Sequence, residues 1–213
     1  MIKIYSAIND HEWSPDTLHQ MLLHLPADMR NKILAYKSWK ERQARIIGKH
    51  ILIELLKDFD LDITLADMLY SPANKPYFNT NFHFSTAHSA DMIICAAGIA
   101  PIGIDIEFIA PIEPQDYRQY LTDKEWLYIQ NAKNKINAFY EIWTKKEAIL
   151  KALGTGLDLE LNTLDVSTNK AIHNNQSFNF CSLNLTDNYI AHIASLFPID
   201  TNQLKMEEFA YTV

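Results

Sequence analysis

The stretch PIGIDIEFI, residues 101–109, alternates as a β-strand does. One face of that strand would be apolar, carrying Ile102, Ile104, Ile106 and Phe108. The other face would hold Asp105 and Glu107 beside Gly103, with the two carboxylates about 6.6 Å apart on a strand that rises about 3.3 Å per residue. Because Asp and Glu form strands poorly, the acidic face needs an explanation. Two interpretations fit: a half-exposed strand with solvated acids, or a pair of ligands for a hard cation such as Mg²⁺.

The composition is that of an ordinary globular protein. The 213 residues are 48% hydrophobic and 11% aromatic, enough for one large domain or two small lobes. A net charge of −7 argues against general nucleic-acid binding. Cys95 and Cys181 lack the spacing of a metal site and are expected to stay reduced. The N-terminal segment does not resemble a signal peptide and no apolar run approaches membrane-spanning length, so we expect a cytoplasmic protein with no membrane partner.

Hydrophobic periodicity predicts an α+β fold. Strands are expected at 1–8, within 81–98, at 101–109, within 177–195 and near the C-terminus. Helices are expected at about 15–24, over 27–58 as one or two helices, and at about 135–153, ending at Gly154. Thr122 followed three residues later by Glu125 predicts a capping box at the start of another helix.

A weak internal repeat predicts two similar lobes. The segment 81–98 resembles 177–195, and a helical segment precedes each of them, at 44–56 and at 140–152. We therefore expect two α+β lobes, 1–102 and 103–213, related by internal duplication. Ligands often bind between lobes, so the acidic strand at the junction is a candidate site.

The helix at about 135–153 carries a polar stripe. Glu147 and Lys151 share a face with Tyr140 and Trp143, opposite the side that holds Ile142, Ile149 and Leu153. They could form a surface ion pair worth about 0.2–0.5 kcal/mol. Alternatively, Glu147 could be a third acid beside the strand, with Lys151 near a phosphate.

Several basic residues could contact an anion. His88 lies among small residues in TAHSA, and Pro76 restricts the backbone after Lys75. A basic run at 28–50 indicates either a solvated helix face or an anion site. With five glycines and no phosphate loop, bound phosphates would have to be held by side chains and a metal.

GIDIE (103–107), followed by WTKKEAILKALGTGL (143–157), resembles the 4′-phosphopantetheinyl transferases of the surfactin-synthetase-activating (Sfp-like) type. NKPYF, FSTAHS and RIIGK match further segments of that family in the same order, with Asn74 standing where the family has glycine. The resemblance implies two similar lobes with the active site in the cleft between them. It also implies a holo-[acyl-carrier-protein] synthase type of enzyme, which moves 4′-phosphopantetheine from coenzyme A to a serine of an acyl or peptidyl carrier protein and releases 3′,5′-ADP.

Residue roles follow from the same resemblance. Asp105, Glu107 and Glu147 would ligate Mg²⁺, with Glu147 and Lys151 as the catalytic pair. The coenzyme would be held by Arg45, Lys75, His88 and Lys146. A single chain could form the complete site as a monomer. Two alternatives stay open: a catalytically silent module that binds coenzyme A or a nucleotide with the same fold, and a two-lobed interaction protein.

Overall fold

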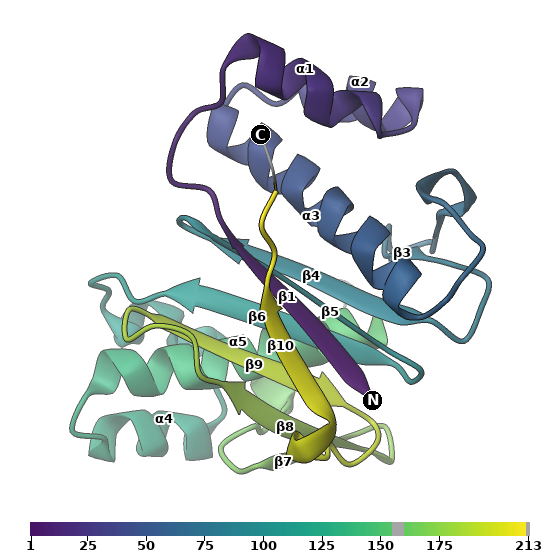
Figure 1. The fold of residues 1–213 in the computed structure, drawn as a ribbon. Coiled ribbons are helices and arrows are strands. Elements are labelled where there is room, and N and C mark those ends of the chain that lie inside the picture. The colour runs from purple at the N-terminus through teal and green to yellow at the C-terminus, as the bar shows by residue number, and fades with distance from the viewer. Residues whose placement is uncertain (155–159, 212–213) are drawn as a thin grey trace.

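The structure is a computed structural model that describes residues 1–154 and 160–211. Two four-stranded sheets form its centre (Figure 1). The first sheet has the order β10-β1-β5-β4 and is built from β1 (Ile2–Ile8), β4 (His83–Ser89), β5 (Met92–Gly98) and β10 (Leu204–Glu208). The second has the order β6-β9-β8-β7 and is built from β6 (Ile102–Phe108), β7 (Lys170–His173), β8 (Gln176–Leu183) and β9 (Tyr189–Ser195). A short pair, β2 (Leu69–Tyr70) and β3 (Pro76–Tyr77), lies apart from both.

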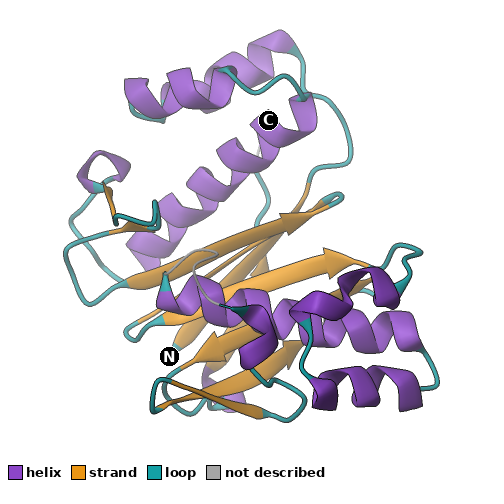
Figure 2. Cartoon of the chain, turned by 180° about the vertical axis from the view of Figure 1, so that it is seen from behind, coloured by secondary structure: helices purple, strands orange, loops and turns teal. Residues whose placement is uncertain are grey.

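Helices cover the outer faces of the two sheets, as the view from behind also shows (Figure 2). The first sheet is covered by α1 (Pro15–Leu23), α2 (Ala27–Leu34) and α3 (Trp39–Asp58), and the second by α4 (Asp123–Asn131) and α5 (Lys135–Leu153). Single 3₁₀ turns occur at η1 (Leu65–Asp67), η4 (Leu161–Thr163) and η5 (Thr201–Gln203), with a longer one at η2 (Pro114–Tyr120). The α+β class is confirmed. Within residues 1–154 and 160–211, none of the helices is both long enough and apolar enough to cross a membrane.

The helix boundaries follow local capping. The Ser38 side chain accepts the Glu41 N–H, which starts α3 and separates it from α2, so the region 27–58 is two helices. Thr122 and Glu125 form the predicted capping box. Helix α5 ends where expected, because Gly154 adopts φ 71°, a left-handed conformation that favours glycine.

Three apolar clusters hold the layers together. One lies between the first sheet and α1–α3, one between the second sheet and α4–α5, and one between the two sheets. Ile102, Ile104 and Ile106 of β6 are buried in the last of these, as the alternation predicts. Phe108 was wrongly predicted to join them. It lies at the end of the strand, is 38% exposed, and contacts Tyr189 edge to face.

Helix α5 crosses β6 in very close contact. A Cβ on Gly103 would lie 1.9 Å from the Ala148 carbonyl oxygen and 2.5 Å from the Ala152 nitrogen. Only glycine therefore permits this approach. The acidic face of β6 lies against α5 as a result.

Edge strands β4 and β6 lie side by side where the sheets meet. The N–H groups of Ile104 and Phe108 in β6 donate to the hydroxyls of Ser85 and Ser89 in β4, at 3.1 and 3.0 Å. These two serines thus satisfy backbone donors that no neighbouring strand pairs. We call this contact the serine seam.

The C-terminal strand returns to the first sheet. β10 pairs in parallel with β1, in the register Ile4 to Met206. Residues from both ends of the chain therefore share one sheet. The proposed lobe boundary between residues 102 and 103 stays a prediction.

Candidate active site

Asp105 is buried beneath α5. It is 5% exposed, and Lys151 of α5 donates to its Oδ1 at 2.6 Å. The pKa of Asp105 is raised to about 7, chiefly by burial and also by the nearby acids Glu107 and Glu147, while Lys151 opposes the shift. Its other oxygen, Oδ2, is buried and has no hydrogen-bond partner among the described residues. The interpretation of this face as freely solvated is therefore wrong for Asp105, because the helix covers it.

Glu107 lies two residues further along β6, half-buried. Its Oε2 accepts a hydrogen bond from the Ser89 hydroxyl at 2.8 Å. Burial raises the pKa of Glu107, while hydrogen bonds from Ser89 and Trp143 and the charge of Lys151 oppose that rise. This carboxylate is thus held from both the first sheet and α5.

Glu147 and Lys151 of α5 line a cavity of about 260 Å³. Burial raises the pKa of Glu147, and the charge of Glu107 adds to the shift. Lys151 reaches across to the strand and pairs with Asp105 instead of serving only the helix surface. The stripe is therefore part of a polar cluster that joins α5 to β6.

Lys75 enters the same cavity from the turn before β3. Its Nζ donates to the Ala152 carbonyl in the last turn of α5 at 2.9 Å, and burial lowers its pKa. A Cβ on Gly154 would lie 2.5 Å from the Lys75 side chain. The last turn of the helix and Lys75 are therefore in direct contact.

A second cavity, of about 340 Å³, adjoins the first, because Asn74, Pro76 and Thr86 line both. Arg45 and His88 both line the second cavity. The resemblance implies that both contact coenzyme A, so their proximity agrees with that expectation. The Arg45 guanidinium stacks 4.0 Å above the ring of Tyr36. Desolvation lowers the pKa of His88, and the charges of Arg45 and Lys151 contribute to that shift.

Two more lysines of the basic run at 28–50, Lys32 and Lys49, line this second cavity, although the resemblance assigned neither of them to the ligand. Burial lowers the pKa of Lys49. A signal was available, since Lys49 follows Arg45 by four residues and therefore shares its helix face. Lys32 lies over the ring of Tyr70, in the segment that leads to Lys75.

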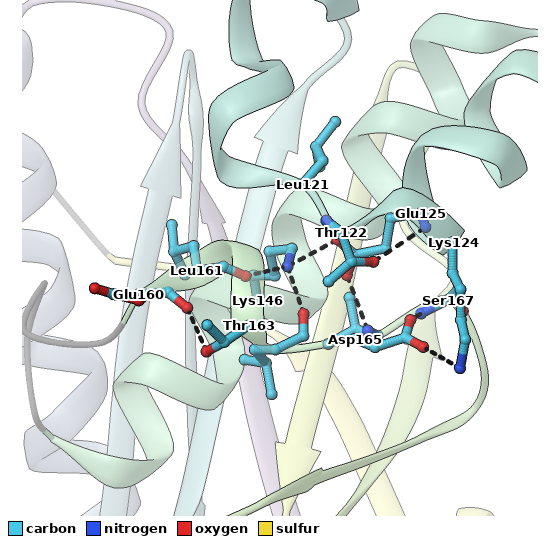
Figure 3. Close-up of polar contacts among 12 residues, drawn as sticks. Leu121, Thr122, Lys124, Glu125, Lys146, Glu160, Leu161, Thr163, Asp165 and Ser167 are labelled. Atoms are coloured by element: carbon cyan, nitrogen blue, oxygen red, sulfur yellow. Dashed lines mark hydrogen bonds and ion pairs between the residues drawn. The ribbon is translucent and has the colours of Figure 1, made fainter.

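The structure does not bring Lys146 to either cavity. Its side chain has no exposed surface, and its Nζ pairs with Glu125 of α4 at 2.9 Å (Figure 3). It also donates to the carbonyls of Leu161 and Leu164 at 2.6 and 2.5 Å. The expectation that Lys146 contacts a phosphate is corrected: its donors are occupied on the far side of α5, where they bind α4 and η4 to the helix.

A metal site is not already assembled in the described ranges. No group of three or more His, Cys, Asp or Glu side chains there is clustered closely enough to hold an ion. The charges of Glu107 and Glu147 nevertheless raise the pKa of Asp105, and the charge of Glu107 raises that of Glu147. Asp105 Oδ2 is also an oxygen without a partner among the described residues. Oxygen donors of this kind suit Mg²⁺.

Comparisons with known proteins match the region that carries these acids. The family model described as "4'-phosphopantetheinyl transferase superfamily" matches residues 101–197, which include β6 and α5. The chain is 27% identical over 147 residues to the 4'-phosphopantetheinyl transferase gsp of Aneurinibacillus migulanus, covering 67% of this chain and 62% of that protein. It is 25% identical over 171 residues to the 4'-phosphopantetheinyl transferase Sfp of Bacillus subtilis strain 168, covering 78% of this chain and 76% of that protein. The chain is thus similar to the 4′-phosphopantetheinyl transferase superfamily over residues 101–197 and to individual 4′-phosphopantetheinyl transferases over more of its length.

Within this superfamily the similarity is to the Sfp-like members named above. A solved structure, the holo-[acyl-carrier-protein] synthase of Thermotoga maritima, aligns at 16% identity with a TM-score of 0.36. That alignment covers 45% of this chain and 61% of the synthase. A similarity this low has no bearing on the fold.

Proposed function

We propose that this chain transfers 4′-phosphopantetheine from coenzyme A to a serine of an acyl or peptidyl carrier protein. The observation that carries the proposal is the cluster of Asp105, Glu107, Glu147 and Lys151, which joins β6 to α5 beside a cavity. The superfamily match covers all four of these residues. The reaction is of the holo-[acyl-carrier-protein] synthase kind and takes place in a single chain, which we propose acts as a cytoplasmic monomer.

We also propose that the two sheets arose by internal duplication. The strands β1-β5-β4 are neighbours in that order in one sheet, and β6-β9-β8 occupy the same order in the other. Helix α3 packs on the first group and α5 on the second. The proposed lobes are 1–102 and 103–213, with β10 returning to the first, and the active site is the cleft between them.

Asp105, Glu107 and Glu147 would hold Mg²⁺. The fit rests on the unpartnered Asp105 Oδ2 and on three carboxylates whose mutual repulsion a dication would remove. When bound, the ion offsets the negative charge of phosphate oxygens. Lys151, now paired with Asp105, would become available to a phosphate.

The side chains of this protein would bind coenzyme A and assist the attack of the carrier serine. Arg45, Lys75 and His88 would hold the adenosine 3′-phosphate part of coenzyme A, because they line the two adjoining cavities. The carrier serine oxygen attacks the phosphorus that bears pantetheine, and the bond to the leaving 3′,5′-ADP breaks. Glu147 takes the proton of the serine, which fits a carboxyl whose pKa burial has raised. Lys151 stabilises the charge that develops in the transition state.

Mass spectrometry tests the proposal. A panel of apo carrier proteins is incubated with this protein, coenzyme A and Mg²⁺, and we expect a carrier to gain the mass of one phosphopantetheine group. The control is the same carrier with its acceptor serine replaced by alanine, which should gain nothing. If coenzyme A binds and no carrier in the panel gains mass, the silent binding module is the better description.

A further inference from the structure

Ser89 occupies a defined position between two groups of β6. Its hydroxyl oxygen accepts the Phe108 N–H at 3.0 Å and lies 2.8 Å from Glu107 Oε2. A serine has one hydroxyl hydrogen, and a backbone N–H can only donate. The Ser89 hydroxyl hydrogen is therefore directed at the Glu107 carboxylate. The Phe108 N–H, which the Ser89 oxygen accepts, helps to set that direction.

This contact reaches Glu107 from the other sheet. Glu107 lies near the end of β6, is itself half-buried, and is followed by the exposed Phe108. A hydrogen bond to an ionised carboxylate is short and strong compared with a neutral one, so it restricts the rotation of the acid. The Ser89 bond fixes one oxygen from the first sheet, and the bond from Trp143 of α5 restrains the same carboxylate from the other side.

We propose that Ser89 is a positioning residue for Glu107 and that it orients this carboxylate for metal ligation. The proposal rests on the proposed function, since it assigns Glu107 to the Mg²⁺ site. Partners that orient a metal-ligating carboxylate typically contribute 10–100-fold in affinity or activity. The serine seam therefore joins the two sheets and also sets the geometry of one acid.

The test compares Ser89→Ala with Ser195→Ala. Ser195 is a buried serine next to the start of β6. Like Ser89, it donates one hydrogen bond and accepts one: its hydroxyl donates to the Pro101 carbonyl and accepts the Phe197 N–H. Each variant loses one donated and one accepted hydrogen bond, and only Ser89→Ala loses a bond to an acid. Thermal melting checks that both variants fold.

The probe is Mn²⁺ with coenzyme A, with free Mn²⁺ measured by electron paramagnetic resonance, because Mn²⁺ accepts the same oxygen ligands as Mg²⁺. We expect Ser89→Ala to bind Mn²⁺ about 10–100-fold more weakly than wild type. Ser195→Ala should bind it as wild type does. Ser89→Thr, which keeps the hydroxyl, should restore most of the affinity.

Equal Mn²⁺ affinity in Ser89→Ala and Ser195→Ala would overturn the proposal, as would a folded Ser89→Thr that binds no better than Ser89→Ala. The wild-type carrier assay separates this failure from that of the proposed function. If the wild type modifies a carrier and Ser89→Ala keeps the wild-type Mn²⁺ affinity, only the role of Ser89 is rejected. If the wild type binds Mn²⁺ but modifies no carrier, the transferase activity is rejected. The positioning role is then decided by the Mn²⁺ affinities of the variants.

Discussion

Lys151 brings a positive charge into a group of three carboxylates. It pairs directly with Asp105, and its charge lowers the pKa of Glu107 and of Glu147 against the effect of burial. It is thus the residue that keeps these acids compatible in the free protein. Its position beside the cavity also makes it available to a bound phosphate.

We expect Glu147→Gln to lower kcat by about 10²-fold or more, because glutamine keeps the size of the side chain but cannot accept a proton. Lys151→Ala should also lower kcat, with little effect on coenzyme affinity, because its contact strengthens in the transition state. The measurement is steady-state transfer to one carrier protein. Glu141→Gln is the matched control, since Glu141 is on the same helix and its carboxylate accepts a hydrogen bond from Tyr128 at the surface. Wild-type rates in both Glu147→Gln and Lys151→Ala would show that these two residues form only a surface ion pair.

At the scale of single elements, the approach of α5 to β6 depends on Gly103. We expect Gly103→Ala to lower the free energy of unfolding by about 1–3 kcal/mol or more, since the added methyl meets helix backbone that cannot move aside cheaply. Gly98→Ala is the control, because its Cβ would meet atoms only at 3.5 Å and beyond. Chemical denaturation measures both. Equal stability of the two variants would show that the helix shifts freely over the strand.

The buried Lys146–Glu125 pair fixes α4 to α5. Lys146→Ala should cost about 3–5 kcal/mol of stability, because it leaves the Glu125 carboxylate buried without its partner. The KM for coenzyme A should not change in protein that is still folded. A raised KM without loss of stability would contradict the structural role and favour phosphate contact.

The sequence predicted the elements with strong local signals and misplaced residues whose surroundings come from distant segments. Helix α5 was predicted correctly because Gly154 ends it and its period is regular. Lys146 was assigned from its place beside Glu147 in a motif. Adjacent helix residues point about 100° apart, so Lys146 does not share the direction of Glu147. It is spaced four residues from Ile142 and three from Ile149, which places it on the apolar side of the helix. The burial of Asp105 was not predictable from β6 alone, because α5 and Lys151 produce it.

At the scale of the whole molecule, segments far apart in sequence pack together, as the bond between Tyr211 and Ile8 shows. The segment after β10 packs on the N-terminal region: Phe209 lies against Tyr5, and Tyr211 lies against Trp13 and donates to the Ile8 carbonyl. The first sheet and its surroundings therefore include contacts made by residues 204–211. We expect the stability of β1 to depend on these contacts.

Phe209→Ala should lower the free energy of unfolding by up to about 1.5–3 kcal/mol, the value for fully burying one large apolar side chain, because Phe209 is partly buried. Hydrogen exchange should show faster exchange in β1, which lies about two hundred residues earlier in sequence. Phe197→Ala is the control, because that ring is 59% exposed. Unchanged protection in β1 would mean that the C-terminal segment adds nothing to the first sheet.

The serine seam also has a consequence for how the protein behaves in concentrated solution. Unpaired strand edges invite neighbouring chains to add strands and aggregate. Each sheet has two edges, and the seam turns one edge of each, β4 and β6, toward the other inside the molecule. The outer edges are β10, with Lys205, Glu207 and Glu208, and the short β7, which begins at Lys170. Charge and shortness discourage strand addition at those two edges. The contact that orients Glu107 thus also shields one exposed edge of each four-stranded sheet from strand addition by another chain.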